Sequence, residues 1–166
     1  MKKLLIILAI IFAIVGGGIF HLFQREEGGV PILLYHRVND IDQDSLTLTV
    51  EQFDAQMKYL YESGYNVITP DELLDAWEGK IEMPDNPVVI TFDDAHVDVY
   101  KNVYPILQKY RMRATFFVVT DYVNLYPSYI TWEQAREMQE SGWVDIESHT
   151  LNHKLMTEIY SRDKLW

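Results

Sequence analysis

The chain has 166 residues, of which 48% are hydrophobic and 23% are charged, a composition ordinary for one globular domain. Its formal net charge of −11 argues against nucleic acid and anionic lipid headgroups as partners, because both are bound by an excess of Lys and Arg. A neutral or cationic polymer suits this charge better. There is no cysteine, so disulfides are excluded and any metal site must be built from His, Asp and Glu.

The N-terminus has the pattern of a membrane-targeting segment. Residues 1–3 include two lysines, and an apolar run follows over residues 4–23. As a helix rising about 1.5 Å per residue, this run would span about 30 Å, the hydrocarbon thickness of a bilayer. We expect a single-pass anchor with the lysines in the cytoplasm and the rest of the chain outside. A cleaved signal peptide, with the glycines of residues 16–18 near the cut, is the alternative.

After a polar linker over residues 24–29, the rest of the chain (30–166) alternates short apolar runs with helical patterns. The runs are mostly β-branched or aromatic and too continuous for half-exposed antiparallel strands, which indicates buried parallel strands. The predicted strands are 31–35, 65–68, 88–92, 114–119 and 143–146.

Capping signals mark the helices between these strands. Thr49 and Thr131 are each followed three residues later by Gln, the pattern of a capping box, and Thr69 precedes Pro70 and Glu72. A further helix is predicted from about residue 97. Repeated βα units imply an α/β fold with a parallel sheet or barrel, and with its functional site at the carboxyl ends of the strands.

Two carboxylates follow the strand predicted over residues 88–92. Asp93 and Asp94 can both reach the mouth of the sheet there. Two carboxylates this close together raise the pKa of one of them unless a cation lies nearby. The simplest interpretation is that one aspartate binds a metal and the other acts as a general base. The alternative is that one of the two caps the following helix.

Two histidines follow the strand predicted over residues 143–146. His149 and His153 are four residues apart, which on a helical turn capped by Ser148 would place both imidazoles on one face. Together with an aspartate they would give three ligands and an open position, the arrangement of catalytic zinc.

These residues resemble a known family. Thr91-Phe92-Asp93-Asp94 and Ser148-His149-Thr150-Leu151-Asn152-His153 are similar to the first two motifs of carbohydrate esterase family 4, the NodB-type polysaccharide deacetylases. Residues 30–36 and 114–118 are similar to strands of its poly-N-acetylglucosamine and cell-wall subgroup. The resemblance implies a distorted (β/α) barrel and metal-dependent removal of N-acetyl, or O-acetyl, groups from an extracytoplasmic polysaccharide such as poly-N-acetylglucosamine or peptidoglycan.

The resemblance also implies residue roles. Asp94, His149 and His153 would hold one divalent metal, Zn²⁺ in the first place and Co²⁺, Ni²⁺ or Fe²⁺ as options, and Asp93 would be the catalytic base. The chain has Ala95 where the family usually has Gly, a strained choice if the backbone there needs a positive φ.

Two further residues are candidates for a pocket. His36 ends the first predicted strand and can face the site, although a hydrogen-bonded structural role is equally open. Trp132 could stack on a sugar ring, and packing at the start of a helix is its alternative.

The family's later motifs, which bear an arginine, an aspartate-tryptophan pair and a Leu-His acid, are not found in this sequence. We therefore expect a partial domain with little activity on its own. Two other functions stay open: an inactive remnant that binds glycan or metal, and a metal-dependent phosphoesterase, which would usually gather two metals.

Overall fold

The computed structural model describes residues 29–155, and the expected membrane segment lies outside them. The described residues contain no helix that is both long enough and apolar enough to cross a bilayer. Residues 31–155 belong to one compact unit. Its main sheet has five strands: β1 (Ile32–Tyr35), β4 (Asn66–Val67), β5 (Pro87–Asp94), β6 (Ala114–Val118) and β7 (Val144–Ser148).

Every pairing in this sheet is parallel, as the sequence predicts. The strand order is β1-β5-β6-β7, and β4 pairs with the beginning of β5. Two short strands, β2 (Arg37–Val38) and β3 (Thr47–Leu48), form a separate parallel pair. The five predicted strands are all confirmed, with ends shifted by one or two residues.

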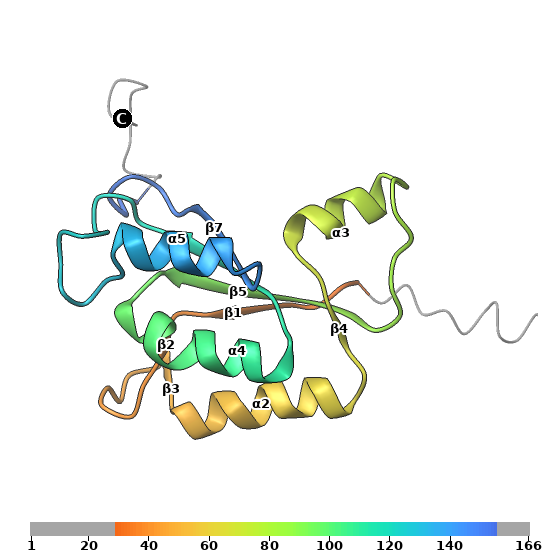
Figure 1. Ribbon diagram of the computed structural model, residues 1–166, viewed down its shortest axis with the longest axis horizontal. Helices are drawn as coiled ribbons and strands as arrows, with labels where there is room; N and C mark the ends of the chain where they lie inside the picture. Colours follow the sequence, from red (N-terminus) through yellow and green to blue (C-terminus); the bar gives the residue numbers. More distant parts are fainter. Residues whose placement is uncertain (1–28, 156–166) are drawn as a thin grey trace, which may run out of the picture. The chain divides into compact units, whose positions relative to one another are not determined.

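Helices connect the strands. They are α2 (Val50–Glu62), α3 (Pro70–Trp77), the π-helical turn η1 (Val99–Val103), α4 (Tyr104–Tyr110) and α5 (Trp132–Glu140). Thr49, Thr69 and Thr131 each cap a helix through a complete capping box, which confirms the boxes predicted at Thr49 and Thr131 and the helix start predicted at Thr69. Figure 1 shows α2 and α4 side by side along the sheet, with α3 apart from them.

The core lies between the sheet and the helices α2, α4 and α5. Phe92 of β5 is fully buried, stacks on Tyr35 at 5.1 Å and meets Phe53 and Phe116 edge to face. Such aromatic pairs contribute about 0.5–1.5 kcal/mol each beyond the area they bury. This cluster fixes β5 in place, and β5 carries the two aspartates at its carboxyl end.

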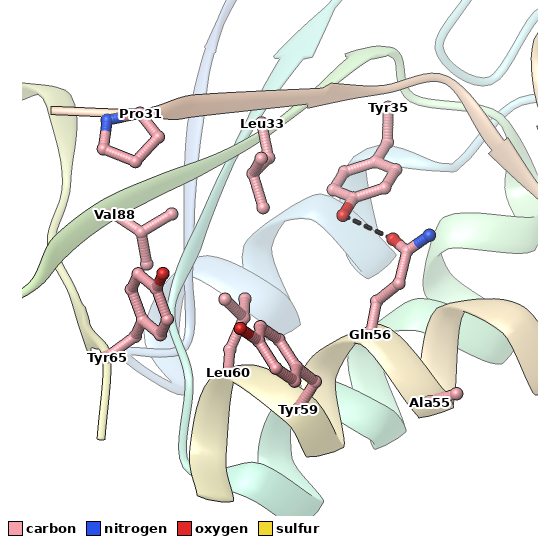
Figure 2. Close-up of a pocket in the computed structure, with 9 residues that line it drawn as sticks. All are labelled: Pro31, Leu33, Tyr35, Ala55, Gln56, Tyr59, Leu60, Tyr65 and Val88. Atoms are coloured by element: carbon pink, nitrogen blue, oxygen red, sulfur yellow. Dashed lines mark hydrogen bonds between the residues drawn. The ribbon is translucent and has the colours of Figure 1, made fainter. Parts of the chain in front are cut away.

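A groove of about 580 Å³ lies between β1 and α2. Figure 2 shows Tyr35 pointing from β1 toward α2, where its hydroxyl donates a hydrogen bond of 2.7 Å to Gln56 Oε1. Burial raises the pKa of Tyr35 from 10.0 to about 12, because the phenolate is disfavoured away from water.

This shift predicts an alkaline loss of stability. Between pH 10 and about 12 the unfolded chain ionises Tyr35 while the folded chain keeps it protonated, so the free energy of unfolding falls as the pH rises. Tyr35→Phe should flatten that part of the curve. Urea denaturation across this pH range tests it, with Tyr61→Phe, whose side chain is exposed, as the control that keeps the parent slope. An unchanged slope in Tyr35→Phe would contradict the assignment.

Candidate metal centre

The candidate site lies at the carboxyl ends of β5, β6 and β7. Asp94, the last residue of β5, pairs with Val118 of β6, which in turn pairs with Ser148 of β7. His149 follows Ser148, and its backbone N–H donates to the carbonyl of Val118 at 2.8 Å. The sheet register therefore places Asp94 and His149 on either side of the end of β6.

Asp94, His149 and His153 form the cluster that the sequence predicts. Asp94 Oδ1 lies 3.4 Å from Nε2 of His153 and 3.7 Å from Nε2 of His149, and the three candidate ligand atoms lie within 4.8 Å of one another. The two imidazole rings are 5.1 Å apart. One carboxylate oxygen and two imidazole nitrogens on a single point are a donor set suited to Zn²⁺.

The state of Asp94 Oδ1 supports this fit. The atom is buried and accepts no hydrogen bond from the described residues. Leaving a buried carboxylate oxygen without a partner costs free energy, and a cation in front of it removes that cost. Since the oxygen faces both imidazole nitrogens, the residues present fit a bound divalent metal.

Asp93 is adjacent to this cluster but outside it. Its Oδ2 lies 3.9 Å from Nε2 of His149, and its side chain is 18% exposed. A carboxylate this close to a metal ligand, and partly open to solvent, can accept a proton from water held at the site. Neither Asp93 nor Asp94 caps the next helix, because η1 begins at Val99 and Asp98 is its N-cap residue.

The predicted helical turn at His149 is wrong. Ser148 is the last residue of β7, and residues 149–153 form a loop rather than a turn of helix. Thr150 and His153 have φ values of 68° and 54°, and Thr150 Oγ1 accepts a hydrogen bond of 3.0 Å from the backbone N–H of His153. Two left-handed residues, rather than helical periodicity, therefore bring the imidazoles together.

The backbone at the end of β5 is also unusual. Asp94 and Ala95 have φ values of 68° and 57°, in the left-handed region. Ala95 is fully buried, and its carbonyl accepts a hydrogen bond of 3.2 Å from the N–H of Ile130. Because the backbone there has a positive φ, alanine costs about 1 kcal/mol relative to glycine, and burial of its methyl group offsets part of this cost.

The two pocket candidates end in different places. His36 directly follows Tyr35, the last residue of β1, which pairs with Phe92 of β5. Trp132 begins α5, where its backbone N–H donates to Asn124 and its side chain is 41% exposed. Within residues 29–155 no hydrogen bond or ion pair joins Trp132 to the metal cluster, and its role in sugar binding stays a prediction.

His96, two residues after Asp94, also lies beside the site. Its Nε2 is 3.8 Å from Asp94 Oδ2, and its ring stacks on Tyr129 at 4.5 Å. Burial lowers the pKa of His96, and the charge of Arg37 lowers it further. His96 is therefore kept neutral beside the carboxylate that faces the two candidate histidine ligands.

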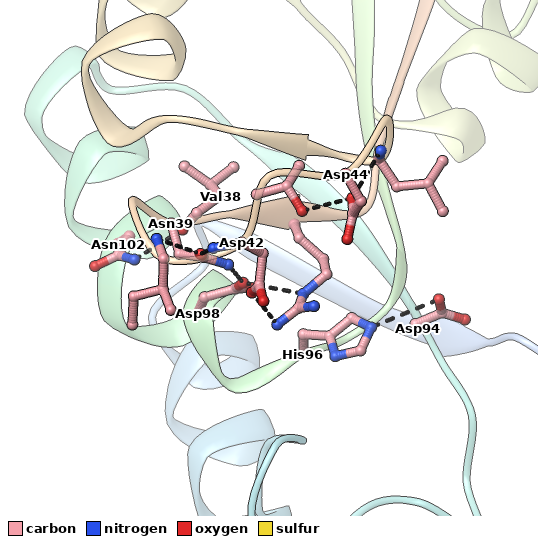
Figure 3. Close-up of polar contacts among 12 residues, drawn as sticks. Val38, Asn39, Asp42, Asp44, Asp94, His96, Asp98 and Asn102 are labelled. Carbon is pink, nitrogen blue, oxygen red and sulfur yellow. Dashed lines mark hydrogen bonds and ion pairs between the residues drawn. The ribbon is translucent and has the colours of Figure 1, made fainter.

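Figure 3 shows, next to His96, an ion-pair network around the buried Asp98 that the sequence analysis missed. Arg37 lies 3.5 Å from the carboxylate of Asp98, which is 7% exposed, and 2.6 Å from that of Asp42. Asn39 donates a hydrogen bond of 2.7 Å to Asp98. The network ties the segment after β1 to the start of η1, and no local pattern signals it because Asp98 is about 60 residues from Arg37 and Asn39.

We expect Arg37→Ala to lower the free energy of unfolding by roughly 2 kcal/mol, because it leaves the buried carboxylate of Asp98 without its cation. Urea denaturation measures the change. Lys58→Ala is the matched control, since the pair of Lys58 with Glu62 is exposed and should contribute at most about 0.5 kcal/mol.

The double variant Arg37→Ala with Asp98→Asn should regain part of the lost free energy of unfolding, because it no longer buries the unpaired charge of Asp98. Equal effects of Arg37→Ala and Lys58→Ala would mean that the network contributes no more than a surface pair.

Comparison with known proteins supports what the fold and the site indicate. The family model described as polysaccharide deacetylase matches residues 80–165. The Bacillus subtilis protein YxkH, itself named as a polysaccharide deacetylase, is 37% identical over 124 residues, covering 75% of this chain and 43% of that protein. The poly-beta-1,6-N-acetyl-D-glucosamine N-deacetylase of Staphylococcus aureus is 34% identical over 147 residues, covering 76% and 50%.

A solved deacetylase structure is similar to this chain as well. The Streptococcus pyogenes deacetylase PplD, in complex with acetate, superposes with a TM-score of 0.70 at 30% identity, covering 75% of this chain and 57% of that one.

The parallel α/β sheet is thus a fold that known deacetylase structures share. The chain belongs to the polysaccharide deacetylase family. It spans half or less of the length of the curated relatives named above.

Proposed function

We propose that the protein is a metal-dependent hydrolase that removes N-acetyl groups, or O-acetyl groups, from an extracytoplasmic polysaccharide such as poly-N-acetylglucosamine or peptidoglycan. One observation carries the proposal: Asp94, His149 and His153 converge on one point, with Asp93 beside them. The names of the relatives support the substrate class, and the acetate in the PplD structure is the product expected of a deacetylase.

The residues divide the chemistry between them. Asp94, His149 and His153 would hold one divalent metal, with Zn²⁺ favoured by the mixed nitrogen and oxygen ligands. Such a metal supplies a Lewis acid that makes water a strong nucleophile near neutral pH. Asp93 would accept the proton of the attacking water, whose oxygen joins the acetyl carbon as the bond to the amine breaks.

The departing amine must gain a proton, which in the family that the chain resembles comes from the histidine of the Leu-His motif. His96 suits this role less well, because burial lowers its pKa and disfavours the protonated form. Acetate and a free amino sugar are then the products of adding water across the amide bond.

We further propose that the sheet is one part of the distorted barrel that NodB-type deacetylases form. The superposition with PplD over 75% of this chain supports this.

The cellular location is a separate proposal. The apolar run over residues 4–23, preceded by two lysines, supports a single-pass anchor with the deacetylase domain outside the cytoplasm. Protease treatment of intact cells tests it: the domain should be digested while a tag added before Met1 stays protected. Digestion of the tag together with the domain would reject this topology.

Acetate release tests the activity. The full protein should release acetate from an N-acetylglucosamine oligomer, lose this activity after chelation, and regain it on addition of about one equivalent of Zn²⁺ per chain. Acetate release that survives complete removal of the metal would reject the metal-dependent mechanism. Release of phosphate from a phosphoester, with no acetate from any acetylated sugar, would reject the deacetylase assignment.

A further inference from the structure

The loop between β6 and α5 forms one wall of the candidate metal centre. Near its beginning, the backbone N–H of Asp121 donates a hydrogen bond of 2.9 Å to the carbonyl of Leu151, which lies between the two candidate histidine ligands in the sequence. Near its end, the N–H of Ile130 donates to the carbonyl of Ala95, the residue after Asp94. The loop therefore joins the histidine side of the centre to its aspartate side.

Asn124 gives this loop a fixed shape. Its backbone N–H donates to the carbonyl of Ile130 at 3.2 Å, and its side-chain oxygen accepts from the backbone N–H of Trp132 at 2.8 Å. At the tip, the N–H of Leu125 donates to the carbonyl of Tyr122 at 3.1 Å. A loop that is ordered before a ligand arrives loses little conformational entropy on binding, so side chains at its tip can add affinity.

Aromatic rings lead from the metal centre to the tip of the loop. His96, which lies beside Asp94, stacks on Tyr129 with 4.5 Å between the ring centroids. The rings of Tyr122 and Tyr126 follow, at 4.9 Å and 6.2 Å from that of Tyr129 and at 5.4 Å from each other. These rings form a continuous aromatic strip, which consists of His96, Tyr122, Tyr126 and Tyr129. A polymer held at the metal centre can follow this strip outward.

Tyr126 is the member of the aromatic strip that is most open to a ligand. It is 48% exposed and is adjacent to Leu125, which is 62% exposed. Large apolar side chains that are exposed together beside a candidate site indicate a binding surface. A tyrosine ring has an apolar face and a polar tip, which match the C–H face and the hydroxyl edge of a pyranose. Asp121 is the single charged residue within 119–131, so the surface suits a neutral sugar chain.

We propose that Tyr126 is the stacking platform of a second sugar subsite, which binds an N-acetylglucosamine unit further along the polymer than the unit held at the metal centre. The proposal rests on the proposed deacetylase function, because both sites take the same polymer. The pyranose packs its C–H face on the ring of Tyr126, and Tyr122 supports that ring edge to face. Longer oligomers therefore bind more tightly than the disaccharide, and Tyr126 sets this preference.

Calorimetric titration of the metal-free full protein with a β-1,6-linked N-acetylglucosamine tetramer tests the subsite. Tyr126→Ala should weaken binding of the tetramer about tenfold, the order expected for the loss of one aromatic stacking contact. Tyr126→Phe keeps the ring and should keep the parent affinity. Tyr59→Ala removes a ring that is 61% exposed on α2, outside the loop, and should leave the affinity unchanged. The disaccharide should lose less affinity than the tetramer in Tyr126→Ala.

A tetramer affinity that is unchanged in Tyr126→Ala would overturn the subsite, as would an equal loss in Tyr126→Phe or Tyr59→Ala. A parent that does not bind the tetramer would overturn it too. Acetate release by the same proteins after zinc is added separates the two proposals. Binding that depends on Tyr126 without any acetate release would reject the deacetylase function alone. Acetate release with an affinity that does not depend on Tyr126 would reject the subsite alone.

Discussion

His149→Ala is expected to lower the affinity of the protein for Zn²⁺ by at least about a hundredfold. Removing a residue that only orients a metal ligand lowers metal affinity about 10- to 100-fold. Removing a ligand itself lowers metal affinity more. His149 and His153 both lie within 3.7 Å of the same oxygen of Asp94, so removal of either imidazole leaves two ligands from the protein. Competition with a fluorescent zinc chelator measures the affinity, and His153→Ala and Asp94→Asn should behave alike.

His36→Ala is the matched control for these variants. His36 lies at the same edge of the sheet but is not among the clustered ligands, so its variant should keep the parent affinity for zinc. A loss of zinc in His36→Ala as large as that in His149→Ala would show that the ligand set is wrong.

Asp93→Asn should separate metal binding from turnover. Asparagine keeps the shape of the side chain but cannot take a proton from water, and general base catalysis contributes about 10²- to 10⁴-fold. We therefore expect acetate release to fall by that factor while the zinc content stays at the parent value. The measurement is kcat on an N-acetylglucosamine oligomer, with metal analysis of the same preparation.

The roles of the two carboxylates depend on that result. If Asp93→Asn is as free of metal as Asp94→Asn, then Asp93 is a ligand and the proposed division is wrong. If it keeps both zinc and full activity, another group accepts the proton.

Most of the fold could be predicted from local sequence. The parallel strands are continuous apolar runs, because both faces of a parallel sheet are covered, and this pattern needs no knowledge of distant residues. The three threonine capping boxes place helix starts to the residue, since both of their hydrogen bonds lie within four consecutive positions. The pairing of β5 with β1, β4 and β6 is a long-range fact that no local pattern contains.

The candidate site, like the fold, could be predicted from the sequence only in part. Asp93, Asp94 and His149 could be predicted because carboxyl ends of parallel strands meet at one edge. The loop at His153 was mistaken for a helical turn, because a spacing of four residues fits both a helix and a loop with left-handed residues. The ion pair of Arg37 with Asp98 joins segments about 60 residues apart, and only the folded chain brings them together.

The number of zinc ions bound per chain tests the central claim most directly. The account assigns one site, built from Asp94, His149 and His153, and therefore predicts one tightly bound ion per chain in the full protein, lost together with any one of the three ligands. Metal analysis of the parent after dialysis against a weak chelator measures it. Two ions per chain, or one ion that persists in His149→Ala, would contradict the single-metal centre.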